Sequence, residues 1–195
     1  TAGYSLSTGG NNLLLGNESG NNMTSGSDNL CLGYKSGFYQ TSGSRNILIG
    51  TTAGYGTNGG TLDSNNNTIM GYQAGTNITT GDNNLLLGYQ VGNNLSTSNN
   101  NIVIGYQSGS TNLTTGSGNL IIGYNVDLEN SGDSNKLVIG GKFDTSSDSG
   151  ILLSGTFNPV ASGREIKVRG TLTVDSDSND NNRSQTKFGG QTYTW

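Results

Sequence analysis

Side chains that could carry acid–base or nucleophilic chemistry are few in this chain and lie far apart. The chain has 195 residues and no histidine, which excludes Ser-His-Asp and Cys-His nucleophilic arrangements and histidine-based metal centres. Glycoside hydrolysis needs two carboxyl groups at a defined separation. Glu18, Glu129 and Glu165 are distant in the sequence and share no motif. We therefore expect a protein that is not an enzyme, with no cofactor and no metal site.

Tyrosine and glutamine are the better candidates for a functional surface, because they recur in the same order along the chain. Each of these tyrosines follows a glycine, and glutamine often comes next. Stacked in register, the rings would form either a ladder that seals a corner of the fold or a platform for sugar rings, with the glutamine amides beside it. Both interpretations stay open, and the candidate receptor or sugar contacts are Tyr34, Tyr72, Tyr89, Tyr106, Tyr124, Gln73, Gln90 and Gln107.

The element that positions these residues is a short repeat. A short apolar run ends in glycine at Gly16, Gly33, Gly50, Gly71, Gly88, Gly105, Gly123 and Gly140, with successive intervals of 17, 17, 21, 17, 17, 18 and 17 residues. Such a unit is too short for a domain, and it has no stretch of helical periodicity. The pattern predicts an all-β solenoid of about eight coils, with the longer interval accommodated as an insertion at a corner.

The apolar triplets predict which side chains face inward. Alternate residues of a strand point to opposite faces, and these triplets are apolar at all three positions. We expect the first and third members to fill the solenoid core: Leu13, Leu15, Leu30, Leu32, Ile47, Ile49, Leu85, Leu87, Ile102, Ile104, Leu120 and Ile122. The middle members would then form a stripe along the axis of a homotrimer, with a dimer as the alternative: Leu14, Cys31, Leu48, Ile69, Leu86, Val103, Ile121 and Val138.

An asparagine precedes nearly every triplet. Stacked strands can align such residues into a ladder in which each amide bonds the coils on either side. We expect this ladder to be structural, because a ligand site would not need the same residue on every coil. Its members are Asn12, Asn29, Asn46, Asn67, Asn84, Asn101 and Asn119.

Composition and charge limit the partners. Hydrophobic residues make up 30% of the chain and glycine contributes 33 residues, which suits a stacked fold whose coils share their apolar side chains. A formal net charge of −4 leaves no basic patch for phosphates, so we expect no nucleic-acid partner. No run is apolar enough to span a bilayer, and we expect no membrane insertion.

The repeats resemble two related groups of fibrous proteins. The Asn-Leu-Leu-Leu-Gly and Asn-Ile-Val-Ile-Gly segments are similar to the head repeats of YadA-type trimeric autotransporter adhesins, which are left-handed β-rolls. The fuller unit, from Gly71-Tyr72-Gln73-Ala74-Gly75 to Asn84-Leu85, resembles the Gly-Tyr-rich repeats of bacteriophage tail fibres. The resemblance covers residues 1 to about 141 and implies a trimeric fibre or adhesin that is extracellular or part of a virion.

The chain divides into a repeat shaft or head (1–141), a short β connector (142–174) and a polar tail or linker (175–195). The leading interpretation is a tail-fibre segment that attaches to a host surface through a polysaccharide or protein receptor. A subunit of a bacterial extracellular filament or trimeric adhesin is one alternative. A fragment of a polysaccharide-degrading tailspike is another.

Overall fold

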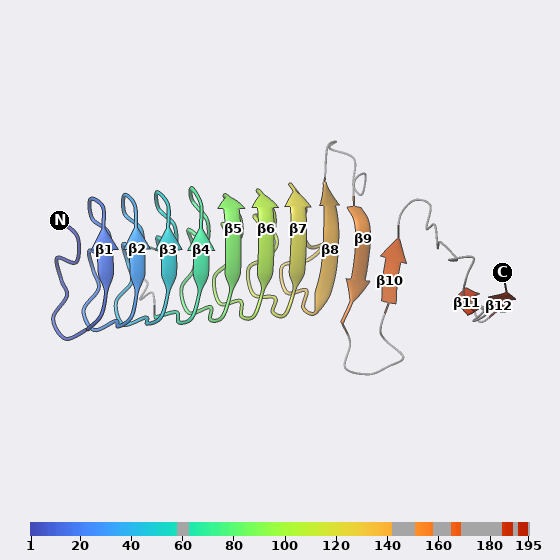
Figure 1. The fold of residues 1–195 in the computed structure, drawn as a ribbon, viewed down its shortest axis with the longest axis horizontal. Coiled ribbons are helices and arrows are strands. Elements are labelled where there is room, and N and C mark those ends of the chain that lie inside the picture. The colour runs from blue at the N-terminus through green and yellow to red at the C-terminus, as the bar shows by residue number, and fades with distance from the viewer. Residues whose placement is uncertain (58–62, 142–150, 158–164, 169–184, 189–190, 195) are drawn as a thin grey trace, which may run out of the picture.

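The computed structural model describes residues 1–57, 63–141, 151–157, 165–168, 185–188 and 191–194. In this part of the chain every regular element is a β-strand, and the polypeptide winds into a single-chain solenoid of about seven turns (Figure 1). Its strands are β1 (Leu13–Leu15), β2 (Leu30–Leu32), β3 (Ile47–Ile49), β4 (Thr68–Met70), β5 (Leu85–Tyr89), β6 (Ile102–Tyr106), β7 (Leu120–Tyr124) and β8 (Lys136–Gly141). Eight strands therefore enclose one turn fewer than the sequence led us to expect.

All eight strands pair in parallel and in register, in chain order. Each triplet lies directly over the next, so that Leu86 pairs with Val103 and Val103 with Ile121. The connector strand β9 (Ile151–Thr156) then runs antiparallel to β8, and β10 (Glu165–Val168) runs antiparallel to β9. A separate hairpin joins β11 (Gln185–Phe188) to β12 (Gln191–Thr194) within the segment expected to be a tail or linker.

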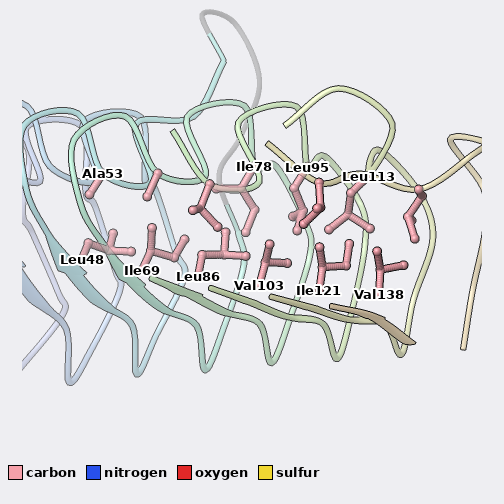
Figure 2. Close-up of a cluster of buried hydrophobic side chains, with 14 of the residues drawn as sticks. Leu48, Ala53, Ile69, Ile78, Leu86, Leu95, Val103, Leu113, Ile121 and Val138 are labelled. Atoms are coloured by element: carbon pink, nitrogen blue, oxygen red, sulfur yellow. The ribbon is translucent and has the colours of Figure 1, made fainter. Parts of the chain in front are cut away.

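The two faces of the triplets are reversed relative to the sequence prediction. The middle residues of β2 to β8 are buried inside the chain's own coil, with exposed fractions from 0% at Cys31 to 7% at Val138. Across the core they meet a second column of apolar side chains from the turns, including Ala53, Ile78, Leu95 and Leu113 (Figure 2). They therefore cannot line an axis shared with other chains; Leu14, in the first coil, is only partly buried and also packs against this core.

The first and third residues lie instead on the outer face of the sheet. Leu13 and Leu15 are 58% and 66% exposed in the terminal coil, and Ile47 and Ile102 are 38% and 41% exposed. The others predicted for the core, Leu30, Leu32, Ile49, Leu85, Leu87, Ile104, Leu120 and Ile122, are partly exposed. The strand alternation was predicted, but alternation alone does not say which face is inside.

The asparagine row identifies the inner face. Asn84 lies two residues before Leu86, so both point to the same side of the strand, and Asn84 is 2% exposed. Asparagine amides can be buried when each one is hydrogen-bonded to its neighbours in the ladder. Leucines can lie on the outer face of a single chain where that face associates with another molecule. The two-residue spacing between the asparagine and the middle triplet residue is visible in the sequence, so the sequence could have identified the inner face.

A glycine follows each triplet because two coils approach too closely there for any side chain. From Gly16 to Gly123 the triplet glycines have φ between 130° and 150°, a region that side chains rarely enter. A Cβ added at Gly105 would overlap the carbonyl oxygen of Gly123, and each of the other glycines in this row meets its neighbour in the same way.

Candidate functional site

The asparagine ladder runs through the buried edge of the solenoid. The Oδ1 of Asn84 accepts hydrogen bonds from the backbone N–H of Asn101 at 3.0 Å and from its Nδ2 at 3.1 Å. The Nδ2 of Asn84 donates to the carbonyl oxygen of Ser98 at 2.8 Å. Equivalent bonds link Asn12, Asn29, Asn46, Asn67, Asn101 and Asn119, and the row ends where the backbone N–H of Lys136 donates to Asn119. These amides hold coils together and leave no group for a ligand.

One coil places a polar side chain at a core position that is apolar in other coils. Gln40 occupies the position that Met23, Ile78, Leu95 and Leu113 hold elsewhere, and it is fully buried. Its Nε2 donates to Asn29 Oδ1 at 2.9 Å and to the Gly43 carbonyl at 2.6 Å. The neighbouring Cys31 thiol is also buried, and this desolvation raises its pKa to about 12. A thiol held neutral in this way is a poor nucleophile.

The tyrosines form a stacked row on the outer surface. Ring centroids are 5.3 Å apart between Tyr72 and Tyr89, 4.9 Å between Tyr89 and Tyr106, and 5.2 Å between Tyr106 and Tyr124. Interplanar angles of 8° to 13° make this a near-parallel stack. The rings remain 39% to 46% exposed, but their neighbours cover the flat faces inside the stack and leave mainly the edges to solvent.

The glutamines form a second row beside the tyrosines. Gln107 Nε2 donates to Gln90 Oε1 at 2.7 Å, and Gln90 Nε2 donates to Gln73 Oε1 at the same distance. Each of these three residues has a positive φ between 49° and 53°. The row therefore has a direction, because the amide nitrogens of Gln90 and Gln107 both donate to the preceding coil.

A second aromatic cluster was missed by the sequence analysis. Phe38 and Tyr55 stack at 5.4 Å, and Tyr39 packs edge-on against both rings. The Lys35 ammonium lies 5.1 Å from the Phe38 ring centre and 5.3 Å from that of Tyr34, and it pairs with Glu18 at 3.3 Å. Hydrogen bonds to Tyr34 and Glu18 raise the pKa of Lys35. The signal was present, since Phe38, Tyr39 and Tyr55 stand at positions where most other coils carry Asn, Ser or Thr.

The outer face of the sheet carries a long, exposed apolar surface. Two aliphatic rows cross β1 to β8, and Thr68 is the polar exception among their members. In β5, β6 and β7 the tyrosine row continues the same face beyond the glycine, as in Leu85, Leu87 and Tyr89. No side chain in the two rows is charged. The two rows alone are roughly 35 Å long at about 4.8 Å per strand.

Within the described ranges, no group of three or more His, Cys, Asp or Glu side chains is placed to hold a metal ion. The same residues include no helix with the length and apolarity required to cross a membrane.

Comparison with known proteins gave no match to a family model, to a curated protein or to a solved structure.

Proposed function

We propose that this chain is a trimeric fibre segment, of the phage tail-fibre type, that attaches to a cell surface. The observation that carries the proposal is the outer sheet face, where aliphatic side chains such as Leu15 and Ile102 are exposed along the length of the solenoid. A contiguous apolar face of this size on a single chain is typical of an association surface.

Another copy of the chain fits this surface best. The face repeats the same uncharged, aliphatic side chains from coil to coil, so an identical rod can lie against it in register. With the tyrosine row included, its projected area is on the order of 500 Å². Because accessible area exceeds projected area, each copy would approach the roughly 600–1,000 Å² that a stable interface buries per partner.

Closed symmetry then limits the assembly. Three copies around a common axis would turn this face inward, as the resemblance to trimeric adhesin heads and tail fibres implies. We also propose that this solenoid winds in the left-handed sense, as those adhesin heads do. The remaining corners, which carry Asn, Ser, Thr and the Phe38 cluster, would face outward and present the chemistry that a receptor reads.

Two measurements test the proposal. Analytical ultracentrifugation of the full chain should give three times the chain mass, and a monomer or a dimer would contradict the trimer. Fluorescently labelled chain should bind a subset of bacterial strains, and periodate oxidation of the surface polysaccharide should reduce that binding. Absence of binding across a broad strain panel would contradict attachment.

A further inference from the structure

Departures from the regular repeat gather around three aromatic residues, Phe38, Tyr39 and Tyr55, which make up the Phe38 cluster. Phe38 and Tyr55 hold equivalent positions in successive coils, since the Tyr39 N–H donates to the Tyr55 carbonyl at 3.0 Å. Tyr55 also lies in the longest repeat interval, which has 21 residues. Lys35, close to the cluster, is one of two basic residues among the first 135. In repeat proteins, departures of this kind mark the face that binds a partner.

Other coils show that the fold does not need these rings. The backbone bonds at this position are the same without them: the Asn22 N–H donates to the Phe38 carbonyl, and the Asn77 N–H donates to the Asn93 carbonyl, both at 3.1 Å. The corner therefore closes equally well on short polar side chains. Three partly exposed aromatic residues at such a place indicate a contact with another molecule. The short polar pairs of the other coils are Asn21-Asn22, Thr76-Asn77, Asn93-Asn94 and Ser110-Thr111.

The cluster lies on the turn side of the solenoid, across the core from the strands. Phe38 and Tyr39 directly precede Gln40, which belongs to the same column as Ile78 and Leu95, because each of these three donates its backbone N–H to the glycine three residues before it. Figure 2 shows that this column faces the strands across the core. An assembly through the outer sheet face therefore leaves the cluster uncovered.

The three rings form a compact surface with polar groups of its own. Phe38 and Tyr55 stack with their planes 17° apart, and Tyr39 lies edge-on to both rings, with centroids at 4.7 Å and 5.1 Å. Burial and a hydrogen bond with Tyr39 raise the pKa of Tyr55, so this phenol stays neutral at physiological pH. The Lys35 ammonium lies near the Phe38 ring, and its ion pair with Glu18 balances its charge.

Size and polarity favour a sugar over a protein partner. Three partly exposed aromatic residues present on the order of 200 Å² together, since a whole aromatic side chain covers about 150–250 Å². A stable protein interface buries roughly 600–1,000 Å² on each partner. One sugar ring matches the smaller surface, because its C–H groups pack on aromatic rings and its hydroxyl groups bond to phenols. The balanced charge of Lys35 favours a neutral sugar over an acidic one.

We propose that the Phe38 cluster binds one neutral sugar residue of a cell-surface polysaccharide. The proposal deepens the attachment function above and rests on it. A surface of this size holds a single sugar weakly, with a millimolar Kd. Three copies of the site on one trimer can engage the same polysaccharide layer, and such linkage raises the overall avidity by about a hundredfold or more.

The test is a saturation-transfer NMR titration of the full chain with methyl glycosides of glucose, galactose, mannose and N-acetylglucosamine. At least one should bind with a millimolar Kd. The double variant Phe38→Asn, Tyr39→Asn installs the pair that two other coils carry, and it should weaken binding at least tenfold. Tyr4→Asn is the matched control, because it removes a 77% exposed tyrosine from the equivalent position of the first coil. This control should change binding less than twofold.

Three results would overturn the site: no binding by any of the four glycosides, equal binding by the double variant and the unaltered chain, or stronger binding of methyl glucuronide than of every neutral glycoside. Circular dichroism checks that the double variant is folded. If it is not, Tyr55→Thr takes its place with the same expected loss, since the next coil carries Thr76 at this position.

Cell binding separates the site from the attachment function. The labelled double variant should bind cells at least tenfold less than the unaltered chain. If the two bind cells equally, the site is wrong and attachment stands. If the unaltered chain binds glycosides but no cells, the site stands and the attachment function is wrong. Cell binding that is lost after protease treatment of the cells, and unchanged by periodate, would assign the cluster to a protein receptor and overturn the sugar site.

Discussion

At the scale of single residues, the triplet glycines impose the strictest requirement on the sequence. Gly105 has a φ of 140°, and a Cβ there would overlap the Gly123 carbonyl. We predict that Gly105→Ala lowers the free energy of unfolding by more than about 3 kcal/mol, since backbone strain and a backbone clash act together. Urea unfolding followed by circular dichroism measures this.

Gly10 is the matched control for that substitution. A Cβ at Gly10 would meet no atom within 4 Å, and its φ is not positive. Gly10→Ala should therefore change the free energy of unfolding by less than about 0.5 kcal/mol. Equal effects of the two substitutions would show that the glycine row is not set by close packing.

Cys31 gives a prediction for high pH. Burial raises its pKa in the folded chain to about 12, from an ordinary value of 9.0. Above pH 9 the unfolded chain loses this proton while the folded chain keeps it, so stability falls as pH rises. Relative to Cys31→Ala, the unaltered chain should lose about 1.4 kcal/mol of unfolding free energy per pH unit between pH 9.5 and 10.5.

Subtracting the unfolding free energy of Cys31→Ala from that of the unaltered chain cancels the titration of tyrosine and lysine, because both chains contain the same tyrosines and lysines. It should be constant from pH 6 to about pH 8, where the thiol is neutral in both states. A difference that stays flat up to pH 10.5 would mean that Cys31 is not desolvated in the folded chain.

At the scale of the coil, the asparagine ladder couples each repeat to the next. Asn84→Leu would leave the Asn101 backbone N–H and the Ser98 carbonyl without their partner in a buried site. We predict a loss of about 2–4 kcal/mol of unfolding free energy, measured by urea titration. Asn94→Ala, on an exposed corner, should cost less than about 0.5 kcal/mol.

Thr51 interrupts the tyrosine row between Tyr34 and Tyr72, and filling this position with an aromatic ring should increase stability. Thr51→Tyr should stack against both Tyr34 and Tyr72 and raise the free energy of unfolding by about 1 kcal/mol, relative to Thr51→Ala. The unaltered chain should lie close to the alanine variant, since Thr51 makes no ring contact. A destabilised Thr51→Tyr chain would show that the space between these rings does not accept another ring.

At the scale of the whole molecule, periodicity predicted the solenoid, the in-register strands and the two ladders, because each follows from recurrence at one phase. The prediction of the inner face was wrong, because aliphatic residues occupy both faces of the strand and periodicity does not distinguish the two faces. That choice is made by the turns, where Ile78, Leu95 and Leu113 supply the opposite wall of the core. It also missed the Phe38 cluster, which departs from the repeat and so carries no periodic signal.

Two adjacent leucines in β5 allow folding and assembly to be tested separately. Leu86 is fully buried in the coil, whereas Leu87 is partly exposed on the outer face. Leu86→Asp places a charge in the core and should unfold the chain, as judged by loss of the β-sheet circular dichroism signal. Leu87→Asp should keep that signal and should change the urea midpoint only as much as a surface substitution does. In a trimer the variant would bring three like charges together at the axis, so its sedimenting mass should fall to that of one chain. A folded Leu87→Asp chain that retains the full oligomeric mass would show that the interface lies elsewhere. A folded, monomeric Leu86→Asp chain would show that the middle residues do line the interface, as the sequence predicted.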